Sequence, residues 1–127
     1  MSHKIYTTYL SRMKYIPKGT MKAIIMRFPP FVNEGPDVVH IPELSPTNEL
    51  FKKYKGDHDW DYFEKEFQNQ IETNQDTMEY LDLLIENLDD PNGNDVCLIC
   101  CEKDNTLCHR RLIAEYLKFL GYEWEEI

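Results

Sequence analysis

The chain has 127 residues, of which 42% are hydrophobic, 13% aromatic and 29% charged, and its formal net charge is −9. These values exclude an intrinsically disordered chain, and the length allows one domain, residues 1–127, to bury a core without disulfide bonds. No run of about eighteen apolar residues occurs, which excludes a membrane-spanning helix.

Charge and cysteine are unevenly distributed along the chain. Residues 1–40 carry a net charge of +4, whereas residues 41–127 carry −13. The acidic part should repel a nucleic-acid backbone, but the basic N-terminal part leaves a local basic face open. The first twenty residues lack the apolar stretch of a signal peptide, and the four cysteines are clustered rather than spread as in a disulfide framework. We therefore expect a cytoplasmic protein with reduced thiols.

Three segments of the first 41 residues are predicted as strands. Residues 4–10 are rich in aromatic and β-branched side chains. Residues 21–28 form an almost continuous apolar run, which is typical of a strand covered on both faces. Residues 38–41 are a shorter strand-like piece that follows a turn signal.

Helical periodicity dominates residues 45–88. Ser45 or Thr47 is suited to cap a first helix, because a side-chain oxygen there accepts a hydrogen bond from a free backbone N–H. A second helix is predicted over residues 60–71, with apolar side chains three and four positions apart, and a third over residues 76–88. The apolar face of the second helix consists of Trp60, Phe63, Phe67 and Ile71.

The last third of the chain predicts a strand, a loop, a helix and a final edge strand. The strand covers residues 96–100, the helix residues 108–120 and the edge strand residues 122–127. Strands interleaved with helices indicate a three-layer α/β fold, in which helices flank a mostly parallel sheet. The helices of residues 45–88 then form one long crossover connection.

The stretch VCLICCEKDNTLCHRR, residues 96–111, holds all four cysteines. In parallel α/β sheets, ligands bind beyond the carboxyl ends of the strands, where loops lead into helices. The first turn of a helix offers free N–H groups and a partial positive charge, so Arg110 or Arg111 beside it would strengthen an anion site. The same environment would lower the pKa of Cys108, and His109 is suited to act as acid, base or hydrogen-bond donor.

Structural roles for these residues stay open as well. Cys97 fits a small apolar side chain on a buried strand, and Cys108 is suited to the same inert packing. Glu102, His109 and Arg110 would then form a buried polar network that only holds the loop.

The spacing of the cysteines disfavours a metal site. Cys97 and Cys100 would face opposite sides of a strand. The gap from Cys100 to Cys108, which is followed by histidine, matches no common structural zinc spacing. We therefore expect no metal and no other cofactor. The phosphate loop of nucleotide hydrolases is absent, and Arg110 follows Cys108 too closely for the anion loop of cysteine phosphatases.

Two stretches have a pattern that goes beyond the periodicity of strands and helices. The first is LICCEK at residues 98–103, followed by CHR at residues 108–110, where a helix begins that continues as LIAEYL. The second is residues 44–67, and YTT at residues 6–8 and MRFP at residues 26–29 accompany them. These stretches resemble the YeaO-like proteins, a bacterial, archaeal and phage family of unknown function (domain-of-unknown-function family four-eight-eight). The resemblance implies a three-layer α/β fold with the Cys-Glu and Cys-His-Arg elements at the carboxyl edge of the sheet.

The resemblance also suggests a candidate site. Glu102 is expected to bond the arginine or to orient His109. Arg27 is expected to join Arg110 in a two-arginine pocket for an anion. The predicted catalytic residues are Cys108, His109 and Glu102. The predicted ligand-binding residues are Arg27, Cys100, Arg110, Ser45 and Thr47.

Three hypotheses for function follow. The first is a pocket that binds or acts on a small anionic compound carrying a phosphate, such as a nucleotide or a sugar phosphate. The second is a non-enzymatic interaction protein whose acidic helices around residues 57–90 bind a basic partner, with Cys-His-Arg as a structural clasp. The third, a nucleic-acid-processing protein, is weakened by the net charge of −9. The sequence names neither a reaction nor an oligomeric state.

Overall fold

Five parallel strands form the central sheet of the structure, a computed structural model that describes residues 3–27, 35 and 37–127. The strands are β1 (Ile5–Tyr9), β2 (Met21–Ile24), β3 (Val38–His40), β4 (Val96–Cys100) and β5 (Trp124–Glu126). Their order across the sheet is β3-β2-β4-β1-β5, and each neighbouring pair is parallel. The predicted α/β fold is therefore confirmed, and across the described residues the sheet is entirely parallel.

The central strand is β4, and all five of its residues are buried. A strand that is covered on both faces has no solvent side to place polar residues on, which is why its sequence is the continuous apolar run VCLIC. Its neighbours contribute fully buried side chains as well, including Ile5 of β1 and Ala23 of β2. The core of the domain therefore lies on both faces of β4.

The described residues form four α-helices, which follow the pattern that the sequence predicts. They are α1 (Asn48–Asp57), α2 (Trp60–Thr73), α3 (Gln75–Asp89) and α4 (His109–Phe119). Thr47, Asp59 and Asn74 cap the first three, since each side chain accepts a hydrogen bond from a backbone N–H of the first turn. Thr47 rather than Ser45 is the cap of α1. Gly121 follows the end of α4 with a φ of +109°, a conformation that glycine adopts without steric strain.

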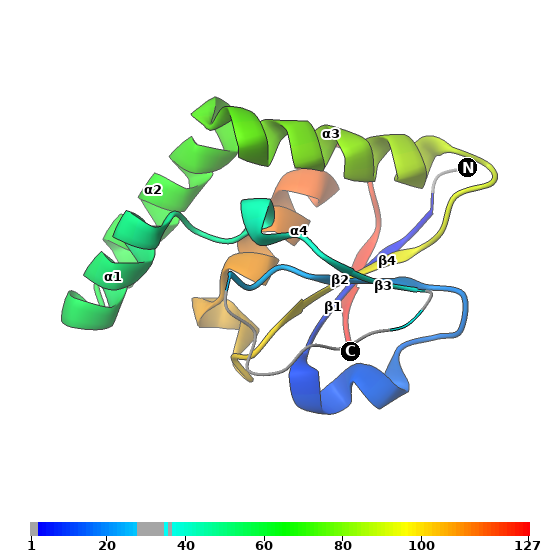
Figure 1. The fold of residues 1–127 in the computed structure, drawn as a ribbon, viewed down its shortest axis with the longest axis horizontal. Coiled ribbons are helices and arrows are strands. Elements are labelled where there is room, and N and C mark those ends of the chain that lie inside the picture. The colour runs from blue at the N-terminus through cyan, green and yellow to red at the C-terminus, as the bar shows by residue number, and fades with distance from the viewer. Residues whose placement is uncertain (1–2, 28–34, 36) are drawn as a thin grey trace.

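The sheet is covered on both sides. Helix α4 packs on β1 and β4, and η1 (Leu10–Tyr15), a 3-10 helix that the sequence did not predict, contacts the same two strands. Figure 1 shows α3 along one side of the sheet and η1 along the other. The α1 helix and the first part of α2 project beyond the end of the sheet (Figure 1). They therefore stand next to the sheet rather than on it.

The second strand is shorter than its apolar run suggests. β2 ends at Ile24, and Ile25 and Met26 continue the chain as buried residues outside the strand. The predicted end of this strand, Phe28, lies outside the described residues. Ile25 still belongs to the sheet edge, because its backbone N–H donates to the carbonyl oxygen of Ile99 at 3.0 Å.

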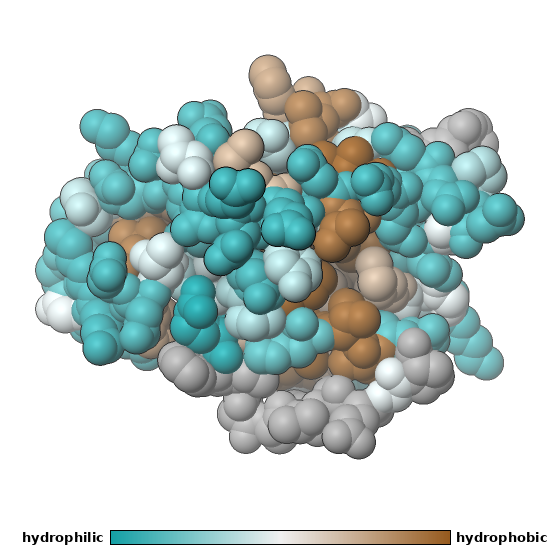
Figure 2. Space-filling model, turned by 45° about the horizontal axis from the view of Figure 1, so that its top comes forward, coloured by the Kyte–Doolittle hydropathy of each residue, from teal (hydrophilic) through white to brown (hydrophobic). Residues whose placement is uncertain are grey.

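The surface is mostly hydrophilic on the face shown in Figure 2, and hydrophobic side chains gather in a band across it. The most exposed large hydrophobic side chain among the described residues is Phe119 at the end of α4, with an exposed fraction of 87%. None of the described helices combines the length and the apolar character that a membrane span requires.

Candidate functional site

The predicted cysteine and histidine residues meet at the carboxyl edge of the sheet, where β4 leads into α4. Cys100 is the last residue of β4, Cys108 directly precedes α4, and His109 is the first residue of that helix. The Nε2–H of His109 donates to the carbonyl oxygen of Ile25 at 2.6 Å. Because β2 and β4 are parallel neighbours, their carboxyl ends lie side by side, and this hydrogen bond joins the start of α4, which follows β4, to the end of β2.

Three side chains form a compact group at this edge. One donor atom each of Cys100, Cys108 and His109 lies within 4.8 Å of the other two. Cys100 Sγ is 3.5 Å from His109 Nε2 and 3.9 Å from Nδ1. The His109 ring also packs edge-on against Phe67, with ring centroids 5.6 Å apart. Since Nε2 is held by Ile25, Nδ1 is the ring nitrogen left to exchange a proton with the neighbouring thiols.

The pKa values of the two thiols in this group are shifted in opposite directions. The hydrogen bond from the Cys100 thiol lowers the pKa of Cys108 to about 4, and His109 and the backbone N–H of Arg110 act in the same direction against burial. Burial and the hydrogen bond to Cys108 raise the pKa of the Cys100 thiol well above its usual range. At neutral pH the group therefore holds one thiolate, on Cys108, and one thiol, on Cys100.

A cavity of about 580 Å³ opens next to these side chains. Its aromatic wall comes from α1 and α2 and consists of Phe51, Tyr54, Trp60 and Phe63. The rings of Trp60 and Phe63 are stacked with centroids 5.0 Å apart, and Tyr54 packs against both. A concave site with an aromatic wall and a few convergent polar groups is typical of small-molecule binding.

Most of the predicted site residues lie on this cavity. Its wall includes Arg27, Ser45, Cys100, Glu102, Cys108 and His109. Arg27 donates from Nε and from one terminal nitrogen to the carbonyl oxygen of Pro46, at 3.4 and 3.2 Å. Ser45 is buried, and its hydroxyl donates to the carbonyl oxygen of Pro42. The catalytic and ligand-binding roles of these residues stay predictions, which their common position supports.

Thr47 lies apart from this cavity. It lines a separate hollow of about 470 Å³ between α1 and α2, and its hydroxyl oxygen accepts from the backbone N–H of Leu50 at 3.3 Å. The structure therefore places Thr47 as the cap of α1. Its predicted role in ligand binding has no support from this position.

Arg110 is fully buried and faces protein groups rather than the cavity. Its Nε and one terminal nitrogen donate to the two carboxylate oxygens of Glu126, at 3.2 and 2.9 Å. The guanidinium also donates to the backbone carbonyl oxygens of Glu102 and Lys103. Arg110 thus joins the loop after β4 to the last strand of the sheet. Arg27 is the arginine of the predicted pair that lies on the cavity wall.

Glu126 is a partner that the sequence analysis missed. Glu102 was expected to bond the arginine or to orient His109. It accepts from Arg110 through its backbone carbonyl, and the carboxylate that pairs with Arg110 is that of Glu126 on β5. The hydroxyl of Thr7 donates to the same carboxylate and accepts from Trp124 Nε1 at 2.8 Å. The register of β1 with β5 pairs Thr7 with Glu126, which only the assembled sheet reveals.

Gln70 is a second residue that sequence patterns did not identify. It is buried on α2, and its side-chain amide donates to the carbonyl oxygen of Ser45 at 2.9 Å and to Thr77 Oγ1 at 3.1 Å. Its carbonyl oxygen accepts from the backbone N–H of Thr47 at 3.0 Å. Gln70 therefore holds the segment that carries Ser45 against α2 and α3. The available signal was a polar residue on the apolar face of a helix, between Phe67 and Ile71.

The group of Cys100, Cys108 and His109 also bears on metal binding. Thiolate and imidazole are the donors that Zn²⁺ and Cu⁺ prefer, and the spacing in the sequence did not suggest that these three would meet. A closed structural zinc site uses four protein donors, whereas the described part of the chain brings three together here. Cys97 does not add a fourth, because residues three apart on β4 face opposite sides of the sheet. The absence of a metal stays a prediction.

The family of the chain follows from a comparison with protein-family models. The model described as the active DUF488-N3 subclade matches residues 5–120. The chain belongs to the DUF488 family. The match spans the sheet from β1 to β4, the cavity and α4, so the resemblance noted from the cysteine motif is confirmed. The chain matches no curated protein and no solved structure significantly. DUF488 membership brings no reaction with it, because the function of the family is unknown.

Proposed function

We propose that this DUF488 protein binds a small anionic compound that carries a phosphate, such as a nucleotide, and acts on it with Cys108 and His109. The observation that carries the proposal is the position of the Cys108 sulfur and the His109 imidazole on the wall of a 580 Å³ cavity that an arginine and an aromatic wall also line. Thiolate, imidazole and guanidinium groups that converge on one cavity are the components of a nucleophilic active site.

Two features support binding of an anion with a flat ring. The aromatic wall offers ring faces of Trp60 and Phe63 on which a nucleobase can stack. Arg27 and Lys55 lie on the cavity wall and supply positive charge, and the N-terminus of α4 adds the partial positive charge of a helix. Glu102 and Asp104 lie on the same wall, so the anionic group belongs near Arg27 and the start of α4 rather than beside these acids.

The chemistry assigned to the two reacting groups follows from their protonation states. The Cys108 thiolate attacks an electrophilic centre of the bound compound and forms a bond to it, while the bond from that centre to the leaving group breaks. The leaving group takes a proton from His109, whose ring is oriented by the hydrogen bond to Ile25. Glu102 lies on the same wall, and in this proposal its carboxylate orients either the compound or His109.

A thermal-shift screen of nucleotides and sugar phosphates tests the binding step. We expect a phosphate compound to raise the melting temperature of the wild type and to do so much less in Arg27→Ala. Lys52→Ala is the matched control, since Lys52 is an exposed cation of α1 that is absent from the residues lining either described cavity. An equal shift in all three proteins would contradict a role for Arg27. Turnover of the compound by Cys108→Ser would remove the thiol from the chemistry.

A non-catalytic interaction protein is the second candidate. The buried pairing of Arg110 with Glu126 favours it, because the arginine of the Cys-His-Arg motif then acts as a structural clasp. The acidic side chains of α2 and α3 would bind a basic partner in this case. Retention of a basic protein by immobilised wild type at low salt, with no phosphate compound shifting the melting temperature, would move this candidate to first place.

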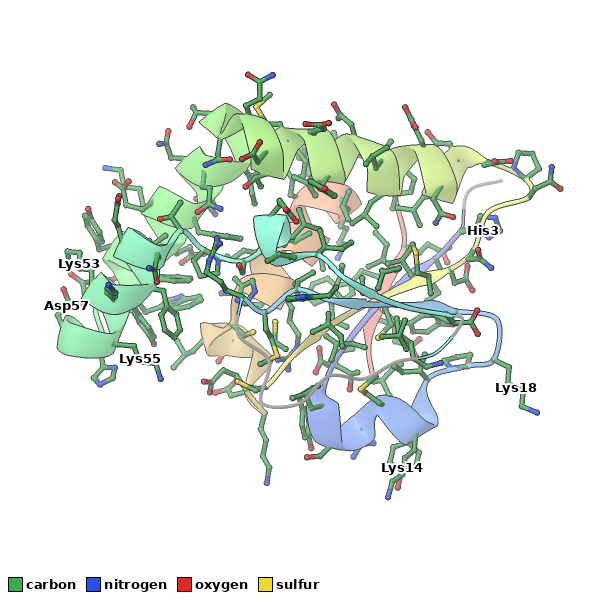
Figure 3. The ribbon with its side chains drawn as sticks, in the orientation of Figure 1. His3, Lys14, Lys18, Lys53, Lys55 and Asp57 are labelled. Carbon is green, nitrogen blue, oxygen red and sulfur yellow. The ribbon has the colours of Figure 1, made fainter. Side chains whose placement is uncertain are left out.

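A nucleic-acid-processing role has less support from the structure. Lys14 and Lys18 lie at the side of the molecule that carries η1, far from the end that carries Lys53 and Lys55 (Figure 3). Lys14 and Lys18 therefore do not add to the positive charge that Arg27 and Lys55 supply at the cavity wall. Filter binding of short DNA and RNA at low salt tests this role, and no retention would dismiss it.

A further inference from the structure

Two thiols of the cavity wall form a pair that a single nucleophile would not require. Cys100 and Cys108 have exposed fractions of only 2% and 3%, yet both line the cavity, and their sulfur atoms lie within 4.8 Å of each other. A disulfide bond is about 2.05 Å long, so the two sulfurs need to approach by less than about 3 Å. Cys100 is the last residue of β4 and Cys108 directly precedes α4, so both side chains lie at the end of an element rather than within one.

We infer that Cys100 and Cys108 are a redox pair that reduces a low-molecular-weight disulfide carrying acidic groups, with Cys108 as the attacking thiol and Cys100 as the resolving thiol. The inference rests on the proposed function only for the Cys108 thiolate, and it adds a role for Cys100 that the proposed function does not need. The cavity next to the pair is open to a small compound, and Arg27 and Lys55 on its wall suit an acidic one.

The reaction proceeds in two balanced exchange steps. The Cys108 thiolate attacks one sulfur of the small disulfide, forms a mixed disulfide with it and expels the other half as a thiolate, which takes a proton from His109. The Cys100 thiol then gives its proton to His109 and attacks the Cys108 sulfur, which forms the Cys100–Cys108 disulfide and expels the second thiolate. That thiolate takes the proton from His109. Two electrons pass from the cysteine pair to the small disulfide, and the two protons that its halves take up come from His109 and from the Cys100 thiol.

The surroundings of the pair assign the order of attack. Cys108 lies at the N-terminus of α4 and accepts hydrogen bonds, which favours its thiolate, whereas Cys100 is enclosed by β4 and stays protonated until His109 takes its proton. Cys101 is exposed and does not belong to the group of three donor atoms. Cys97 faces the other side of the sheet and is absent from the described cavity wall. The chain therefore offers Cys100 as the resolving thiol of Cys108.

Intact-mass analysis of the reduced protein after exposure to oxidised glutathione tests the inference. The wild type is expected to lose two hydrogen atoms in mass, to keep no glutathione and to yield a linked Cys100–Cys108 peptide. Cys100→Ala is expected to keep one glutathione, because the mixed disulfide on Cys108 is not resolved. Cys108→Ala is expected to remain unmodified at Cys100. Cys101→Ser is the matched control and should behave as the wild type.

Three results would overturn the inference, and they separate it from the proposed function. A lasting glutathione adduct on Cys108 of the wild type, at the level seen in Cys100→Ala, would leave Cys108 a nucleophile without a resolving thiol. No reaction of the wild type, before or after a chelator is added, would remove the reactive thiolate from both proposals. If the thiols react only after a chelator is added, a metal ion is bound by Cys100, Cys108 and His109. Peptide mapping of the wild type keeps the test valid if a variant does not fold.

Discussion

Arg110 and Glu126 form a bidentate ion pair, in which two nitrogens of the guanidinium donate to the two oxygens of the carboxylate at 3.2 and 2.9 Å. The arginine side chain is completely buried, whereas the Glu126 side chain has an exposed fraction of 26%. The pair connects the first turn of α4 with the last strand of the sheet. It therefore holds the start of α4, and with it Cys108 and His109, in a fixed position on the sheet.

Replacement of this arginine should destabilise the fold. Arg110→Ala leaves the carboxylate of Glu126 and the loop carbonyls without their donor, so we expect the free energy of unfolding to fall by about 3 kcal/mol, the low end for a broken buried pair. Urea denaturation measures this change. Lys53→Ala is the control, because Lys53 pairs with Asp57 at the exposed surface of α1 and its loss should change the free energy of unfolding far less. An Arg110→Ala protein as stable as the wild type would exclude the structural clasp.

The reactivity of Cys108 should persist at low pH. Because its pKa is lowered to about 4, the thiolate is fully present from pH 6 to 8, and its rate of alkylation by iodoacetamide should be flat across that range. The rate should fall only below about pH 5, as the thiolate takes up a proton, whereas an ordinary cysteine with a pKa of about 8.5 reacts ever faster up to pH 8. The measurement uses Cys101→Ser, which lacks the exposed cysteine. A rate that rises tenfold per pH unit between pH 6 and 8 would contradict a stabilised thiolate.

Loss of the Gln70 amide should loosen the segment beside the cavity. Gln70→Ala removes the partners of Ser45, Thr47 and Thr77 in a buried site, so we expect a loss of about 2 kcal/mol in the free energy of unfolding. Chemical denaturation measures it. Gln68→Ala, an exposed position on the same helix, should change stability by less than about 0.5 kcal/mol. Equal effects of the two changes would show that the network contributes nothing.

The aromatic wall should contribute to ligand affinity. Trp60→Leu removes the ring that stacks on Phe63, so the affinity for the nucleotide with the largest thermal shift should fall by about 1–2 kcal/mol, or roughly tenfold, in calorimetric titrations. Trp124→Phe is the control, because Trp124 lies on β5 and bonds Thr7 away from the cavity. A ligand that binds Trp60→Leu as tightly as the wild type would place its ring elsewhere.

Local sequence patterns determined the elements of the fold. Alternation of element types along the chain indicated a parallel α/β sheet, and the continuous run VCLIC marked the central strand because a strand buried on both faces has no polar side. The capping oxygen of Thr47 and the spacing of Phe63 and Phe67 are likewise encoded by neighbours in the chain. The 3-10 helix of Leu10–Tyr15 escaped prediction, since so short an element has too little periodicity to be recognised.

Both the sequence motif and the tertiary structure were needed to define the candidate site. The cysteine motif and its resemblance to a DUF488 signature identified Cys100, Cys108 and His109 from the sequence, because these residues lie within ten positions of one another. Only the tertiary structure decided the hydrogen-bond partners at the start of α4. His109 bonds Ile25 and Arg110 bonds Glu126, and each partner comes from another strand or strand end. Strand order and register determine such contacts, and a spacing of residues along one segment carries no information about which strand will lie beside it.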